Sequence, residues 1–263
     1  MKNKSSSLSP AQISGIILLS GAVAAFFINS WLAIAIALFY ILLCVVMSFC
    51  YRSNFYLPVI SRGDTGKNMV ALTFDDGPDE PTTRQILTLL DKYAVKATFF
   101  VSGVNALKYS EIIKEIISRG HTIGNHSFHH NPFLMLGSYN YLYHEVAQAQ
   151  EVLKNMGVSV LAFRPPVGII SPKLPQVLNK RGLFCVTFSC RAGDAGNRNI
   201  KNLSTRILKK VKPDDIILLH DVNPRGEENK AVLLIEVEKI LRGLNEKNLK
   251  VVPLADLIGR EVN

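Results

Sequence analysis

The sequence VALTFDDGP, at residues 70–78, is the starting point for predicting the architecture of this chain. Its first five residues are an apolar run that predicts a buried β-strand, and Asp-Gly-Pro is typical of a turn. Asp75 and Asp76 therefore leave the strand together. Two adjacent carboxylates at such a position repel each other and lose hydration, so they need a cation or a hydrogen-bond donor nearby. A turn with a helix cap is the competing interpretation of the doublet alone.

Short apolar runs alternate with amphipathic segments of helix length through the rest of the chain. This alternation predicts an α/β fold with a parallel sheet, either doubly wound or closed into a barrel. The predicted strands are 70–74, 97–101, 121–125, 161–164, 183–189, 216–220 and 250–253, and the predicted helices are 82–93, 110–119, 139–156, 172–181, 200–211 and 231–246.

Residues 5–51 contain no charged residue and no histidine. Two apolar blocks, 13–28 and 31–50, fill this stretch, and a helix needs ~20 residues to cross a bilayer core of ~30 Å. We therefore predict a membrane anchor at residues 1–51, built as a tight transmembrane helical hairpin, followed by a linker at 52–67. A cleaved signal peptide is the alternative, because Ala22-Val23-Ala24 resembles a cleavage site. The second block would then still anchor the chain.

Basic residues flank the apolar stretch on both sides. Lys2 and Lys4 precede it, and Arg52, Arg62 and Lys67 follow it. The positive-inside rule places both flanks, and the large domain with them, in the cytoplasm of a multi-pass protein of the cell membrane. The chain has 30 Lys and Arg against 21 Asp and Glu. Attraction to an anionic lipid surface explains this excess.

The overall composition excludes several other classes of protein. At 48% hydrophobic and 19% charged residues, the chain is neither disordered nor collagen-like. No basic run interleaved with aromatic residues occurs, so nucleic acid is not an expected partner. Cys185 and Cys190 lie five apart; if one strand carries both, their side chains should point to opposite faces. They are not expected to form a disulfide.

Three of the six histidines follow the third predicted strand, at positions 126, 129 and 130. His126 and His130 are four residues apart, so on one helical turn their rings would share a face and converge on a metal ion. His126 with His129 is a competing pair, and histidines on a solvated loop are the alternative without a metal. The carboxylate doublet at another strand end favours the metal site.

Polar residues also follow the later predicted strands. Arg164 enters the rigid segment RPPVG at 164–168, which suits a guanidinium that grips a carboxylate. Asp194 follows the fifth predicted strand, and His220-Asp221 stands at the end of the sixth. A lone histidine after an apolar strand is more often structural than catalytic. Here it joins a set of polar residues at the strand ends, which favours a catalytic role.

Four motifs together resemble the polysaccharide deacetylase family, which is carbohydrate esterase family four with the chitooligosaccharide deacetylase homology domain. They are TFDDGP (73–78), HSxxH (126–130), RPPxG (164–168) and LxHD (218–221), and the resemblance covers roughly residues 68–257. It implies a distorted barrel of about seven β/α units in a catalytic domain at 68–259. It also implies a metal-dependent hydrolase that removes an N-acyl group, by default N-acetyl, from an amino sugar in a glycan.

The family's pattern implies that Asp76, His126 and His130 bind one divalent metal ion, usually zinc. Three protein ligands leave an open position for a water molecule, whose pKa zinc lowers from ~15.7 toward ~7. Asp75 matches the general base and His220 the general acid that protonates the departing amine.

The resemblance also assigns residues around this centre. Arg164 matches the residue that orients the base, with Asp194 as a carboxylate partner. Leu218 matches a wall of the pocket that receives the acyl methyl group, and the backbone N–H of Val167 matches the oxyanion donor.

The chain departs from the family's pattern around the predicted groove. Val167 stands where an aromatic residue is common, and Ala195 stands where a tryptophan is usual. Arg191 replaces an acid found in many members. A groove without these aromatic surfaces is less suited to a long glycan.

Two other functions compete with glycan deacetylation. One is deacetylation or deformylation of an amino sugar on a polyprenyl-phosphate carrier at the membrane face, which the hairpin and the basic charge favour. The other is an inactive sugar-binding domain, which predicts loss of a metal ligand or of the acid–base pair. All five of those positions are filled.

Overall fold

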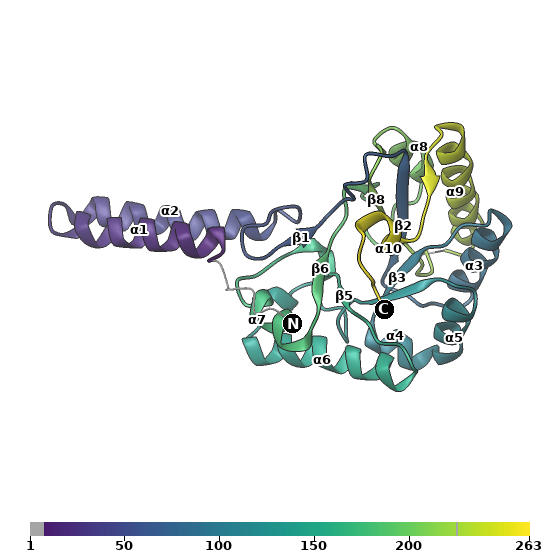
Figure 1. Ribbon diagram of the computed structural model, residues 1–263, viewed down its shortest axis with the longest axis horizontal. Helices are drawn as coiled ribbons and strands as arrows, with labels where there is room; N and C mark the ends of the chain where they lie inside the picture. The colour runs from purple at the N-terminus through teal and green to yellow at the C-terminus, as the bar shows by residue number, and fades with distance from the viewer. Residues whose placement is uncertain (1–7, 225) are drawn as a thin grey trace.

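A computed structural model describes residues 8–224 and 226–263. Its N-terminal part is a pair of apolar helices, α1 (Pro10–Phe26) and α2 (Ser30–Ser48). Ser9 caps α1 together with Gln12 in a capping box, and the Asn29 side chain accepts hydrogen bonds from the first backbone N–H groups of α2. The two helices lie side by side and project away from the rest of the chain (Figure 1).

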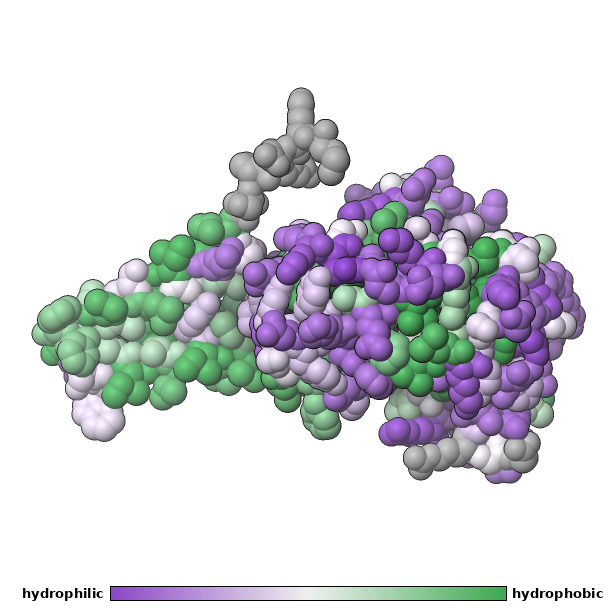
Figure 2. All heavy atoms as spheres, turned by 90° about the horizontal axis from the view of Figure 1, so that it is seen from below, coloured by the Kyte–Doolittle hydropathy of each residue, from purple (hydrophilic) through white to green (hydrophobic). Residues whose placement is uncertain are grey.

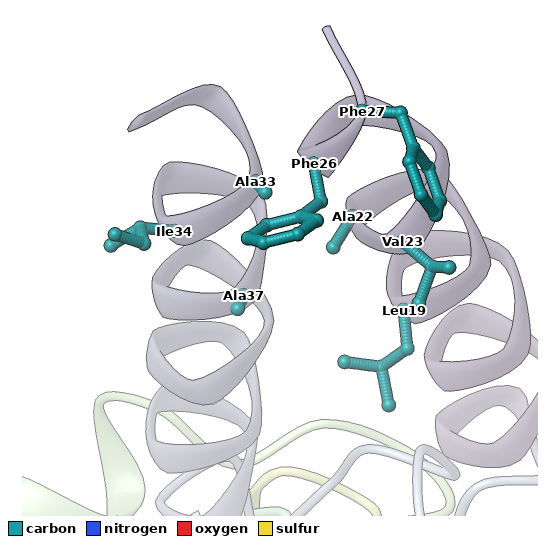
Figure 3. Close-up of a pocket in the computed structure, with 8 residues that line it drawn as sticks. All are labelled: Leu19, Ala22, Val23, Phe26, Phe27, Ala33, Ile34 and Ala37. Atoms are coloured by element: carbon teal, nitrogen blue, oxygen red, sulfur yellow. The ribbon is translucent and has the colours of Figure 1, made fainter. Parts of the chain in front are cut away.

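The length and composition of α2 are those of a membrane-spanning helix. It has 19 residues, whereas α1 is a shorter apolar helix of 17 residues. An entirely apolar groove of about 410 Å³ lies between the two helices far from the sheet, and its eight lining residues are labelled in Figure 3. Figure 2 shows hydrophobic residues covering this helix pair. An N-terminal anchor or signal sequence fits these features, and a hairpin across the membrane stays a prediction.

A curled parallel sheet follows the helix pair, as the alternating pattern predicts (Figure 1). Its strands pair in the order β1-β6-β5-β4-β3-β2-β8-β7, and β9 also pairs with β2. β2 is the longest strand, and it is buried from its second residue onward. The strands are β1 (Val59–Ile60), β2 (Met69–Asp75), β3 (Thr98–Val101), β4 (Thr122–Asn125), β5 (Ala162–Phe163), β6 (Phe184–Val186), β7 (Cys190–Arg191), β8 (Ile216–His220) and β9 (Lys250–Val251).

Amphipathic helices cover the outside of the sheet (Figure 1). In α5, for example, Ile112, Ile113 and Ile116 are buried and form one apolar face. Between sheet and helices, the rings of Phe74 and Phe99 stack with centroids 5.1 Å apart. The helices are α3 (Thr82–Lys92), α4 (Gly103–Lys108), α5 (Ser110–Ser118), α6 (Tyr139–Asn155), α7 (Leu174–Arg181), α8 (Leu203–Leu208), α9 (Glu227–Glu246) and α10 (Leu254–Ile258), with 3-10 turns η1 (Leu134–Leu136) and η2 (Pro166–Gly168).

The strand predicted at 183–189 is too long, because only β6 (Phe184–Val186) lies within it, and a separate strand, β7 (Cys190–Arg191), begins just after it. β6 pairs with β1 and β5, whereas β7 pairs with β8 on the other side of the sheet. Between them, the Ser189 N–H donates to the carbonyl of Ile216 and the chain crosses to β8. Cys185 and Cys190 therefore lie on different strands, and no two cysteines of the described residues are paired.

The end of α2 and the residues just after it are hydrogen-bonded to segments that follow β5 and β6. The N–H of Ile170 donates to the carbonyl of Ser48 (2.9 Å), and the Thr187 hydroxyl donates to the carbonyl of Tyr51 (2.7 Å). Part of the segment predicted as a linker, residues 52–67, forms β1 and joins the sheet beside β6. The proposed domain boundaries remain predictions.

Candidate metal centre and active site

The predicted site residues meet at one edge of the sheet. Asp75 is the last residue of β2 and His220 the last of β8, and these two residues are paired in register. His126 follows β4 directly, and Arg164 follows β5. Parallel strands bring their carboxyl ends to the same edge, so four separated motifs contribute to one site.

Asp76, His126 and His130 form a compact group of possible metal ligands. The Nε2 atoms of His130 and His126 lie 3.0 and 3.3 Å from Oδ1 of Asp76. One ligand atom from each residue lies within 4.8 Å of the other two. Burial alone would raise the pKa of Asp76, but the two histidines hold it well below its usual range. Two imidazoles and a carboxylate are a donor set that fits a zinc ion with an open position.

The ring of His126 is oriented by the backbone. Its Nδ1 lies 2.7 Å from the carbonyl oxygen of Arg164, and the side chain is 1% exposed. A carbonyl oxygen only accepts, so Nδ1 carries the proton and donates. In the neutral ring Nε2 is then the lone-pair nitrogen, which is the arrangement that a metal-binding histidine needs.

The helical turn predicted for residues 126–130 is wrong, because these residues form an irregular loop. Ser127 (φ 67°) and His130 (φ 54°) adopt left-handed backbone conformations, which turn the chain back on itself. The competing ligand His129 faces the other way. Its Nδ1 lies 2.5 Å from Oε1 of Glu145, and its backbone N–H donates to the other oxygen of the same carboxylate.

Arg164 holds Asp75 from the interior of the sheet. Its guanidinium donates to Oδ1 of Asp75 (2.6 Å) and to the hydroxyl of Thr73 (2.8 Å). The other terminal nitrogen donates to the carbonyl of Thr187 (2.8 Å), and the ring of Phe100 lies beneath the group at 3.9 Å. Complete burial lowers the pKa of Arg164, and Asp75 opposes that shift. This geometry suits a residue that orients a base.

Asp194 pairs with His220 and not with Arg164, which corrects the expected partnership. The Asp194 carboxylate lies 2.7 Å from Nδ1 of His220. Burial alone would lower the pKa of His220, but this ion pair raises it to about 9. The amide of Asn197 donates to the carbonyl of His220 (2.9 Å) and its backbone N–H to Asp194 (3.4 Å). Arg164 has Asp75 as its carboxylate partner instead, although β3 and β4 lie between the strands that carry the two residues.

The two predicted pocket residues lie near this edge. Leu218 lies on β8 two residues before His220, so both side chains point to the same face of the strand. Val167 lies in η2, three residues after Arg164, and is 52% exposed. Its φ of 52° is left-handed, which is a strained conformation for a β-branched residue.

Comparison with known proteins identifies the family. The family model for polysaccharide deacetylases matches residues 62–186. A peptidoglycan-N-acetylglucosamine deacetylase of Bacillus cereus is 32% identical over 196 residues, which cover 74% of this chain and 70% of the relative. The chain belongs to the polysaccharide deacetylase family. The predicted family is thereby confirmed.

Two further relatives of this polysaccharide deacetylase family member support the same assignment. A chitooligosaccharide deacetylase of Sinorhizobium fredii is 33% identical over 174 residues, covering 65% of this chain and 80% of the relative. The crystal structure of the Bc1960 peptidoglycan N-acetylglucosamine deacetylase matches with a TM-score of 0.71 at 29% identity, covering 78% of this chain and 94% of the other. The predicted (β/α)-type fold is confirmed.

Two residues of this deacetylase-family site were not predicted from the sequence. Thr187 links Arg164 to Tyr51 through its carbonyl and its hydroxyl, and no motif marks it. Asp221 was visible beside His220 but received no role. Its carboxylate is fully buried, and it accepts from the Thr83 hydroxyl (2.7 Å) and from the N–H of Gly77 (3.1 Å). Burial raises the pKa of Asp221 to about 7. Asp221 thus ties the TFDDGP turn to β8.

Proposed function

We propose that this protein removes an N-acetyl group from an amino sugar by metal-dependent hydrolysis. The observation that carries the proposal is that two ion pairs, Arg164 with Asp75 and Asp194 with His220, lie beside the three candidate ligands. Oδ2 of Asp75 lies 3.8 Å from Nε2 of His126, and Nε2 of His220 lies 3.9 Å from Oδ2 of Asp76. A base and an acid therefore flank one centre, which is what hydrolysis of an amide needs.

A divalent ion held by Asp76, His126 and His130, which we propose to be zinc, would supply Lewis-acid activation of a water molecule and of the amide carbonyl. The carboxylate of Asp75, held in place by Arg164, accepts the proton of the attacking water. An amide nitrogen is a poor leaving group until it is protonated.

His220 supplies the proton that the amide nitrogen needs in order to leave. Its Nδ1 is occupied by Asp194, so Nε2 is the atom that donates to the departing amine. The N–H of Val167 is the proposed donor to the oxyanion, and Leu218 the proposed wall for the acyl methyl group. Preorganised donors of this kind are worth ~3–4 kcal/mol each in other acyl-transfer enzymes.

Acetate release tests this function. Full-length protein in detergent, loaded with zinc, should release acetate from an N-acetylglucosamine oligomer, and chelation should abolish the release. Failure to release acetate or formate from any N-acylated amino sugar, with zinc bound, would contradict the proposal and favour an inactive sugar-binding domain.

A substrate on a polyprenyl-phosphate carrier is a second candidate, and one contact favours it. The segment just after RPPVG is attached to the end of α2, because the N–H of Ile170 donates to the carbonyl of Ser48. This contact holds the candidate active site close to the apolar helices. Acetate and formate release from N-acetyl and N-formyl amino sugars, lipid-linked and free, separates this candidate from a glycan deacetylase.

We also propose that α1 and α2 both cross the membrane and leave the large domain in the cytoplasm. The support is the pair of basic flanks, Lys2 with Lys4 and Arg52 with Arg62. A reporter that is active only in the cytoplasm should be active when fused after residue 263. Activity of an export-dependent reporter at the same position would contradict this orientation.

A further inference from the structure

The four most exposed large apolar side chains among residues 52–224 and 226–263 lie on neighbouring segments of the globular domain. Within residues 52–224 and 226–263, only four large apolar side chains are 52% exposed or more. Single exposed apolar residues need no explanation, but a group at one edge marks an interaction site. We call these residues the apolar rim: Leu107 (54%), Phe133 (68%), Leu136 (77%) and Val167 (52%).

All four rim residues lie on segments that follow consecutive strands at the catalytic edge. Leu107 is in α4, after β3; Phe133 and Leu136 are in and beside η1, after β4; Val167 is in η2, after β5. α4 reaches the site itself, because the amide of Asn105 donates to the carbonyl of Asp76 (2.8 Å). The rim therefore borders the candidate active site.

Neighbouring rim segments are in direct contact. The N–H of Val104 in α4 donates to the carbonyl of Phe128, which precedes η1 (3.0 Å). The ammonium group of Lys173, which follows η2, donates to the carbonyl of Gly137 at the end of η1. The three segments thus form one continuous border and not three separate loops.

The border continues into the apolar helix pair. Gly168, the residue after Val167, lies directly against the side chain of Tyr51. Ile170 is hydrogen-bonded to Ser48, the last residue of α2. The guanidinium groups of Arg52 and Arg191 both lie on the ring of Tyr51, at 5.6 and 5.1 Å. Cations at this junction suit the anionic head groups of a bilayer.

We propose that the apolar rim inserts into the membrane interface, with α2 as its anchor. The continuity of the rim with an apolar 19-residue helix and the cations between them favour a lipid surface as the occupant. An amino sugar carried by a lipid phosphate would then reach Asp75 and His220 without leaving the membrane surface. This part of the inference rests on the proposed function, whereas insertion of the rim does not.

Fluorescence tests the insertion directly. Trp31 is the single tryptophan, so a Trp31→Phe background has no tryptophan fluorescence of its own. Phe133→Trp and Ile235→Trp are introduced into it separately, and the full chain is placed in vesicles of phosphatidylcholine and phosphatidylglycerol with brominated acyl chains. Ile235 is a matched control, being 50% exposed on α9. We expect the brominated lipid to quench the tryptophan at 133 and not the one at 235. Quenching at neither position, or equally at both, would overturn the proposal.

An activity comparison tests the consequence for the substrate. The double variant Phe133→Ser/Leu136→Ser should keep acetate release from a water-soluble N-acetylglucosamine oligomer. Release from N-acetylglucosamine on a polyprenyl phosphate in vesicles should fall about tenfold, because the effective concentration of substrate at the site falls. Val232→Ser/Ile235→Ser is the control. Equal loss on both substrates, or loss on neither, would contradict the role in substrate access. If the unmodified protein cleaves neither substrate, the proposed function fails, and the fluorescence result still decides the insertion.

Discussion

At the scale of single residues, Asp75 and His126 have separable roles within one cluster. Arg164 holds Asp75, which is not one of the three candidate ligands. We expect Asp75→Asn to lower acetate release by roughly 10²–10⁴-fold, the usual contribution of a general base, and to leave zinc binding intact. His126→Ala removes a ligand, so it should lower both acetate release and the zinc content of the purified protein.

Metal analysis and acetate release on the same preparations check this separation. His129→Ala is the matched control for His126→Ala, because His129 faces Glu145 and not the cluster. Loss of zinc in Asp75→Asn, or full zinc content in His126→Ala, would contradict the assignment of ligands.

Val167 offers a second test at this scale, because its backbone is strained. Asparagine tolerates the left-handed region better than a β-branched residue. We expect Val167→Asn to raise the free energy of unfolding by about 1 kcal/mol, the lower end of the cost of such strain. Thermal unfolding in detergent measures it. Val104→Asn, on a regular helix and also part-exposed, should not be stabilising; a lower melting temperature for Val167→Asn would contradict the argument.

At the scale of elements, His121 joins the beginnings of β3 and β4. Its Nδ1 accepts the N–H of Ala97 (3.1 Å), and its Nε2 is buried without a partner. Burial and the charge of Lys96 lower the pKa of His121 to about 4. Between pH 6.5 and about 4, this histidine is therefore protonated in the unfolded chain and neutral in the folded chain. The free energy of unfolding consequently falls as the pH drops through this range.

We expect this histidine to contribute on the order of 3 kcal/mol to that loss of stability. His121→Asn keeps an oxygen that accepts from Ala97 and does not titrate. Its free energy of unfolding should fall less between pH 7 and pH 4 than that of the unmodified protein. Chemical denaturation at both pH values measures the difference, and identical falls would disprove the role of His121.

The elements also show what could be predicted from sequence. Helices such as α5 were predictable because their buried isoleucines repeat at helical spacing. The early end of β6 and the separate strand β7 were not, because they depend on which neighbouring strands each segment pairs with. The loop at 126–130 was misread as a helical turn for a similar reason. Ser127 and His130 adopt left-handed backbone conformations although neither is a glycine, so the sequence does not mark these turns.

At the scale of the whole molecule, the site was more predictable than its surroundings. Parallel strands have their carboxyl ends at one edge of the sheet, so Asp75, His126 and His220 could be grouped because each stands at the end of a predicted strand. The pairing of Asp194 with His220 depends on the loop after β7, whose path the sequence does not reveal. The link from Tyr51 through Thr187 to Arg164 begins with a bond between residues 136 positions apart, which no local pattern reveals.

The proposed hairpin leads to a prediction for the whole chain. If α1 and α2 both remain in the membrane, the purified protein should retain α1, which packs against α2 through the bond from Tyr40 to Ala11. Intact mass spectrometry should therefore show no loss of residues 10–26. A mass that corresponds to cleavage after Ala24 would show a signal peptide and leave α2 as a single anchor.

The central claim is that two imidazoles and one carboxylate from separate strand ends share a divalent ion. X-ray absorption at the zinc edge of the full-length protein measures this most directly. We predict stoichiometric zinc bound by two imidazole nitrogens, with oxygen atoms as the other ligands, and one fewer imidazole in His130→Ala. Zinc bound by sulfur, or a spectrum that His130→Ala leaves unchanged, would contradict the account.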